Sequence, residues 1–212
     1  MSDRGNRMLL AVAFATAAAL AVGVMGYTFW RGHQGDKAAE ARSVAAPALA
    51  GPKVGGPFQL VDQDGRKVTE ADLRGKPTLM FFGFTFCPEV CPTTLTELTG
   101  WLKALGPDAD RLNVVFVSVD PERDTPAQLK TYLSNFDPRI RGLTGTPEQV
   151  AQAAKAYRVY YRKVPVEGGE YTMDHSSMIY LFDKDGGFVE PIGYGEAGDR
   201  AMAKVRKLLQ TP

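Results

Sequence analysis

Three short apolar runs stand out along the chain. Residues 79–86, 114–119 and 178–182 contain almost no polar position. A run that is this short and does not alternate with polar residues is typical of a strand buried on both faces of a sheet. We therefore predict three central strands.

Four other segments show apolar residues at helical spacing. Two of them begin with Thr-Pro-x-Gln, at Thr125 and at Thr146, a sequence that combines a capping box with proline at the first helical position. The other two lie at 95–105 and 202–209. The spacing predicts four helices, two of them with well-defined starts.

Two turn sequences predict β-hairpins, one at 64–65 and one at 185–187. Pro191 restricts the last strand to a sheet edge, because proline has no N–H to donate to a neighbouring strand. The order hairpin, strand, helix, strand, helix, helix, strand, strand, helix predicts an α/β sandwich with parallel and antiparallel strands. This is the order of a thioredoxin-like fold.

The chain ahead of this domain contains a long apolar segment. Residues 8–30 carry no charge and are bounded by Arg7 and Arg31. As a helix this segment would extend about 35 Å, enough to cross a hydrocarbon core of about 30 Å. We expect a short N-terminal head at 1–7, a single transmembrane helix at 8–30, a flexible tether at 31–53 and the domain at 54–212. Because no Arg/Ser-rich presequence precedes the anchor, we expect a bacterial inner membrane, with the domain in the periplasm.

The composition limits the chemistry. Lys+Arg 25 against Asp+Glu 24 gives a net charge of +1, which provides no field to attract nucleic acid. With two cysteines and two histidines, one chain cannot build a four-cysteine zinc site, an iron–sulfur cluster or a disulfide-dense scaffold. We expect no nucleic-acid partner and a small, local site.

Residues 84–92, Phe-Thr-Phe-Cys-Pro-Glu-Val-Cys-Pro, place Cys87 and Cys91 where a buried strand ends and a helix begins. We predict that the helix starts with Pro92 at its first position and Cys91 as its cap. A thiol at a helix N-terminus meets the positive end of the helix dipole, which lowers its pKa. Both sulfurs are expected to take part in thiolate chemistry.

Three uses of the cysteine pair remain open. A structural disulfide between Cys87 and Cys91 would close a very short loop and so stabilise the fold little. A redox dithiol would serve a thiol-disulfide reductase. Two thiolates with one further neutral donor would form the soft, low-coordinate site that selects Cu(I).

His175 is the one histidine in the domain and is the candidate for a third metal ligand. It precedes the last central strand, and in a thioredoxin-like sheet the loop before that strand lies beside the cysteine helix. The alternative is a loop histidine satisfied by hydrogen bonds. Met173 and Met178 are soft enough to bind copper, but we expect them to be core residues.

Three segments resemble the signatures of the Sco/SenC family: 83–92, 117–126 and 174–176. Sco proteins are thioredoxin-fold copper proteins that help to assemble the binuclear copper centre of cytochrome c oxidase subunit II. The resemblance implies that Cys87, Cys91 and His175 bind copper. Cu(I) is favoured, with Cu(II) as an alternative. The resemblance also implies that subunit II is a partner and that a periplasmic copper donor loads the protein.

The resulting hypothesis is a membrane-anchored copper chaperone that is not an enzyme and that delivers copper to subunit II by ligand exchange. The alternative is an enzyme, a thiol-disulfide oxidoreductase that uses Cys87 and Cys91 to keep the partner's cysteines reduced. A peroxidase is a weaker third option, because the wider activating pattern is missing around Cys87. Asp120 and Asp174 are candidates for an outer shell around the metal, although turn and cap chemistry also accounts for Asp120.

Overall fold

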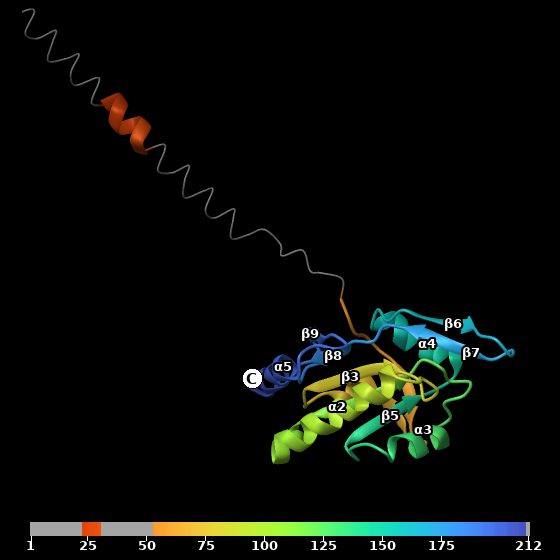
Figure 1. Ribbon diagram of the computed structural model, residues 1–212. Helices are drawn as coiled ribbons and strands as arrows, with labels where there is room; N and C mark the ends of the chain where they lie inside the picture. The colour runs from red at the N-terminus through yellow and green to blue at the C-terminus, as the bar shows by residue number, and fades with distance from the viewer. Residues whose placement is uncertain (1–22, 31–52, 211–212) are drawn as a thin grey trace, which may run out of the picture. The chain divides into compact units, whose positions relative to one another are not determined.

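The computed structural model describes residues 23–30 and 53–210 (Figure 1). Residues 23–30 are helical. The rest of the predicted head, anchor and tether, residues 1–22 and 31–52, lies outside the described residues. The domain boundaries given above therefore stay predictions.

Within the described parts of the chain, no helix is both long enough and apolar enough to cross a membrane. This contradicts the predicted single-pass location in a bacterial inner membrane with a periplasmic domain, and that prediction is withdrawn.

Residues 53–210 are built around a seven-stranded sheet with the order β2-β1-β5-β4-β3-β8-β9. The three central strands β3, β4 and β5 are parallel to one another, and the strands that flank them are antiparallel. The sheet strands are β1 (Gln59–Asp62), β2 (Lys67–Thr69), β3 (Thr78–Gly83), β4 (Asn113–Ser118), β5 (Ile140–Thr144), β8 (Ile179–Phe182) and β9 (Phe188–Ile192).

Helices join and cover these strands (Figure 1). Both predicted Thr-Pro starts are confirmed: the hydroxyls of Thr125 and Thr146 accept hydrogen bonds from the backbone N–H groups three residues on. These bonds satisfy donors that the first helical turn leaves free. The predicted capping box is complete only at Thr146, because the N–H of Thr125 donates to the carbonyl of Arg123 instead. The helices are α2 (Val90–Leu105), α3 (Pro126–Leu133), α4 (Pro147–Ala156) and α5 (Gly198–Gln210), with 3-10 turns at Glu70–Leu73 and Gly106–Arg111.

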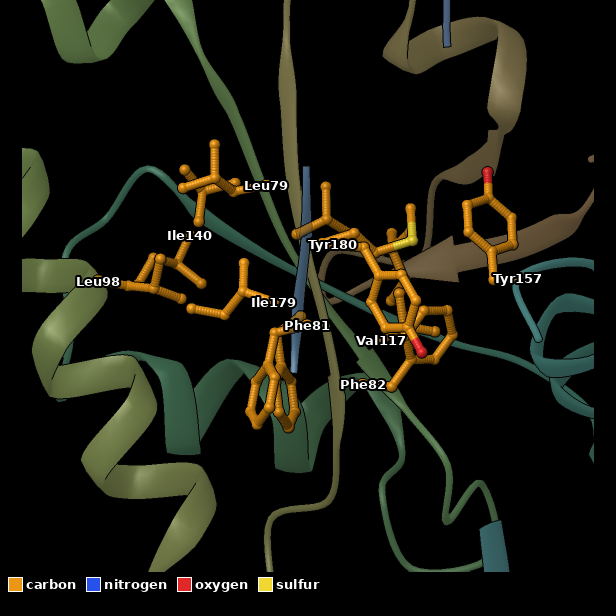
Figure 2. Packing of buried hydrophobic residues seen from close by; sticks show 14 of the residues in the cluster. Leu79, Phe81, Phe82, Leu98, Val117, Ile140, Tyr157, Ile179 and Tyr180 are labelled. Carbon is orange, nitrogen blue, oxygen red and sulfur yellow. The ribbon is translucent and has the colours of Figure 1, made fainter. Parts of the chain in front are cut away.

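The core lies on both faces of the central strands, as their unbroken apolar pattern predicts. Figure 2 shows Phe81 of β3 and Leu98 of α2 on one side of the strand, and Phe82 on the other side with Tyr180 and Tyr157. The ring of Phe82 lies 5.9 Å from each of these tyrosine rings. All six residues of β3 are buried, so the strand that leads to the cysteines is rigidly held.

The predicted mixed α/β thioredoxin-like architecture is confirmed, and Pro191 lies in the edge strand β9 as expected. The pattern missed two features. One is β5, whose sequence Ile-Arg-Gly-Leu-Thr is too short and mixed to signal a strand. The other is a separate two-stranded sheet of β6 (Tyr161–Pro165) and β7 (Tyr171–His175), whose polar residues obscure any alternation.

Candidate metal centre

The cysteine segment connects the end of β3 to the start of α2. The helix begins at Val90 with Glu89 as its cap, so the predicted start with Pro92 first and Cys91 as cap is wrong by two residues. Pro92 instead takes the third helical position. Proline is tolerated there because the N–H groups of the first turn have no partner within the helix in any case.

This earlier start puts the backbone of Cys91 in the first turn, where its N–H is free to bond outside the helix. It donates to Cys87 Sγ at 3.4 Å. The Cys87 N–H in turn donates to the carbonyl of Phe84 at 3.3 Å. Cys91 is completely buried and Cys87 is half-buried, so one sulfur faces the core and the other meets the surface.

The two thiols have opposite tendencies to ionise. A hydrogen bond from the Cys91 side chain lowers the pKa of Cys87 to about 4, helped by His175 and by backbone N–H groups and opposed by burial. The same hydrogen bond raises the pKa of Cys91, and burial adds to the rise. Both cysteines are free thiols in the structure. The metal-free pair therefore consists of a Cys87 thiolate and a Cys91 thiol.

His175 is the last residue of β7 and not, as predicted, part of a loop. Its Nε2 lies 3.7 Å from Cys91 Sγ, and its Nδ1 lies 2.9 Å from the carbonyl of Ser176. A proton on Nδ1 satisfies that carbonyl and leaves the lone pair of Nε2 directed at the sulfur. The ring also packs edge-on against Phe84, with the centroids 5.7 Å apart. The imidazole is therefore held in an orientation suited to a metal ligand.

The donor atoms of Cys87, Cys91 and His175 all lie within 4.8 Å of one another. Three such donors around one metal, at bond lengths of roughly 2.0–2.3 Å, would stand roughly 3.8–4.0 Å apart in a trigonal plane. The cluster therefore needs only small side-chain adjustments to close on an ion. Two sulfurs and one imidazole form a soft, low-coordinate donor set, which is the kind that Cu(I) prefers.

One side of the cluster opens to the surface. A hollow of about 290 Å³ reaches Cys87 and His175 between the cysteine segment and β7. Its lining residues are Phe84, Cys87, Pro88, Glu89, Val90, Thr172, Met173, Asp174, His175 and Ser177. A small ligand or a partner's side chain has access to two of the three donors.

The remaining candidate residues are placed differently from the cluster. Asp120 is buried and is paired with Arg123 and with the hydroxyl of Tyr171. Asp174 is half-exposed and lies 3.6 Å from Arg162, although it borders the hollow. Neither carboxylate is hydrogen-bonded to a donor residue of the cluster. Met173 is a core residue and Met178 packs against the core, as expected.

Two further residues support the arrangement of the cysteines. Asp124 accepts hydrogen bonds from the N–H and hydroxyl of Thr85, at 3.0 and 2.6 Å, and so holds the cysteine segment. Gly83 allows Cys91 to approach, because a Cβ there would lie 2.7 Å from its Sγ. A glycine at the end of an otherwise bulky strand was the available signal for this close approach.

Comparison with known proteins supports this description. The SCO1/SenC family model matches residues 46–210. The mitochondrial protein SCO2 of Saccharomyces cerevisiae is 41% identical over 162 residues, covering 74% of this chain and 53% of its own. The mitochondrial SCO1 homolog 1 of Arabidopsis thaliana is 43% identical over 148 residues, covering 69% of this chain and 44% of its own. The chain thus spans about half the length of these two relatives.

Solved structures agree with the fold. Copper-bound ScoI of Bradyrhizobium japonicum is 54% identical with a TM-score of 0.69, covering 73% of this chain and 99% of that one. BsSco, described as having a disulfide switch and as a member of the Sco family of cytochrome c oxidase assembly proteins, is 27% identical with a TM-score of 0.60. It covers 76% of this chain and 96% of its own. The curated relatives named above are mitochondrial, which likewise lends no support to the withdrawn bacterial location.

Proposed function

The chain belongs to the SCO1/SenC family, and from that premise we propose that it is a copper-binding assembly factor of cytochrome c oxidase. One observation carries the proposal: the donor atoms of Cys87, Cys91 and His175 gather within 4.8 Å. The copper-bound ScoI structure and the BsSco description support the same metal and the same process.

Copper is bound here as Cu(I), through the sulfurs of Cys87 and Cys91 and Nε2 of His175. Soft thiolates favour this ion, and a third neutral donor completes a low-coordinate site. The Cys87 thiolate is present without a metal because of its lowered pKa. Binding therefore needs to displace only the Cys91 proton, and the ion then compensates for the burial of that sulfur.

The cargo is delivered to subunit II of the oxidase, and a separate copper donor loads the site. Transfer proceeds by ligand exchange: an incoming thiolate of the partner reaches the metal through the hollow beside Cys87 and His175. It replaces one donor at a time, which a three-coordinate, half-open site permits and a closed tetrahedral site resists. No turnover chemistry is required.

The test is an anaerobic Cu(I) titration of the full chain against a competing chelator. We expect one tightly bound Cu(I), and X-ray absorption should count two sulfur donors and one nitrogen donor. His175→Ala should weaken binding by at least about tenfold and remove the nitrogen donor. His33→Ala is the matched control, since His33 is the chain's other histidine, and it should bind like the wild type. Equal binding by the His175 and His33 variants would refute the copper site.

A thiol-disulfide reductase is a second candidate, favoured by the pairing of a Cys87 thiolate with a free Cys91 thiol. In that reaction Cys87 attacks a disulfide of the partner and releases one partner thiolate. Cys91 then gives up its proton and attacks the mixed disulfide, which leaves a Cys87–Cys91 disulfide and a reduced partner. The partner disulfide is the two-electron oxidant, and an external dithiol resets the pair. This chemistry does not need His175, so full reduction of a model disulfide by His175→Ala together with weak copper binding by the wild type would favour it.

A further inference from the structure

The hairpin that carries His175 is not part of the main sheet. Strands β6 and β7 pair only with each other, and within residues 53–210 no backbone ladder joins them to the seven-stranded sheet. The position of His175 relative to the cysteines therefore depends on the short link through residues 176–178 to β8 and on the contacts that the hairpin makes with the rest of the domain.

One face of β7 makes those contacts. Side chains alternate along a strand, so Tyr171, Met173 and His175 share a face. Met173 is buried in the core, and His175 reaches Cys91. Tyr171, at the other end of the strand, reaches residues 120–124, which we name the anchor turn because both ligand-bearing segments attach to it.

Arg123 of the anchor turn holds the Tyr171 end of the hairpin. Its Nη1 donates to the carbonyl of Tyr171 at 2.9 Å, and its guanidinium lies 3.8 Å from the centre of the Tyr171 ring. Its Nε pairs with Asp120, whose other oxygen accepts the hydroxyl of Tyr171 at 2.8 Å. Arg123 and Asp120 thus contact the backbone, the ring and the hydroxyl of Tyr171.

The same guanidinium also contacts the cysteine segment. It lies 4.7 Å from the ring centre of Phe86, the residue before Cys87. Its Nη2 is buried without a hydrogen-bond partner, so ring contacts alone hold that side of the group. The next residue, Asp124, fixes Thr85 of the cysteine segment. The anchor turn is therefore attached to both segments that supply metal ligands.

We propose that Arg123, acting with Asp120 on Tyr171, is a positioning residue that sets the approach of His175 to the cysteine pair. The residue touches none of the three donors itself. Without it the hairpin loses the guanidinium contacts to the anchor turn and keeps there only the Tyr171–Asp120 hydrogen bond and the exposed Lys163–Glu122 ion pair. His175 then leaves the cluster while Cys87 and Cys91 stay in place. This inference deepens the proposed function, because it states what makes the site three-coordinate.

The first test uses the metal-free full chain. The imidazole resonances of His175 are assigned by their loss in His175→Ala. In Arg123→Ala we expect them to move to the shifts of a solvent-exposed histidine, with hydrogen exchange of the hairpin amides about tenfold or more faster. Tyr171→Phe keeps the ring and removes one hydrogen bond, so exchange should be about fivefold faster. Arg162→Ala is the matched control, since Arg162 lies on the outward face of the same hairpin and pairs with the half-exposed Asp174.

Unchanged His175 resonances and unchanged hairpin exchange in Arg123→Ala and Tyr171→Phe would overturn the proposal, as would an equal change in Arg162→Ala. If Arg123→Ala does not fold, the comparison of Tyr171→Phe with Arg162→Ala decides. These readouts contain no copper, so they remain decisive even if the proposed function fails.

The second test measures Cu(I) affinity by chelator competition. Arg123→Ala should bind about 10- to 100-fold more weakly, the range found when an outer partner of a metal ligand is removed. The double variant Arg123→Ala/His175→Ala should bind no more weakly than His175→Ala, because Arg123 acts through the histidine. An additive loss in the double variant would show that Arg123 affects binding by another route.

Discussion

Replacing Gly83 by alanine tests the close contact on which the buried cysteine depends. A Cβ at this position would lie 2.7 Å from Cys91 Sγ and 2.7 Å from Cε2 of Phe116. Ordinary contact begins near 3.4 Å, so each neighbour must withdraw by about 0.7 Å. The backbone of Gly83 is in a region open to any residue, so the effect is steric and not conformational.

Overpacking of a tight core costs about 1–3 kcal/mol, and we expect Gly83→Ala to lose that much stability. A displacement of about 0.7 Å also exceeds the tolerance of about 0.5 Å for a binding constellation. Cu(I) affinity should therefore fall by at least about tenfold. The sulfur most affected is the one 3.7 Å from His175 Nε2.

Gly100→Ala is the matched control, because the same added methyl group meets nothing within 4 Å on the surface of α2. Alanine is the better helix former, so this variant should gain about 0.5–1 kcal/mol. Urea unfolding should separate the two midpoints by about 1–2 M at a slope of about 2 kcal/mol/M. Equal midpoints, or unchanged copper affinity in Gly83→Ala, would refute the steric argument.

Three further predictions concern reactivity and stability. Iodoacetamide should alkylate the metal-free protein at Cys87 and spare Cys91. Because the pKa of Cys87 is lowered to about 4, the alkylation rate should stay nearly constant from pH 8 to about 5 and fall only below that. An alkylation rate that follows a pKa near 9 would contradict this prediction. Asp124→Ala leaves the donors of Thr85 and Ser118 unsatisfied and should cost about 2–4 kcal/mol in urea unfolding. The exposed Asp174→Ala should stay within about 0.5 kcal/mol, and equal losses would count against the buried network. Thr146→Ala removes the capping box of α4 and should cost about 1 kcal/mol without changing copper affinity, an expectation that a change in affinity would contradict.

The residue pattern alone determined most of the helices and strands and, in the site, the placement of the two cysteines. Unbroken apolar runs predicted the central strands, because a strand that is covered on both faces carries apolar residues on both of them. Threonine and proline marked the starts of α3 and α4 through local hydrogen bonding. The position of Cys87 and Cys91 between a strand and a helix followed in the same way, since it depends only on neighbours in the chain.

Other features were decided by the tertiary structure. The helix start at Val90 differs from the local prediction because the tolerance of the first turn for proline spans several positions. The strands β6 and β7 are too polar to show a pattern, and their placement depends on contacts made by Arg123 and Tyr171. These contacts join residues 48 positions apart, so no local rule predicts them.

The meeting of His175 with Cys91 is the clearest example. The two residues are 84 positions apart. The expectation that they adjoin came from the order of the elements and from the family resemblance, and not from any local pattern around either residue. A local pattern reflects backbone preferences and the burial of one face, which act over a few residues. A ligand set assembled from separate segments depends on how those segments pack, and here that packing includes a glycine without a side chain and an arginine between two rings.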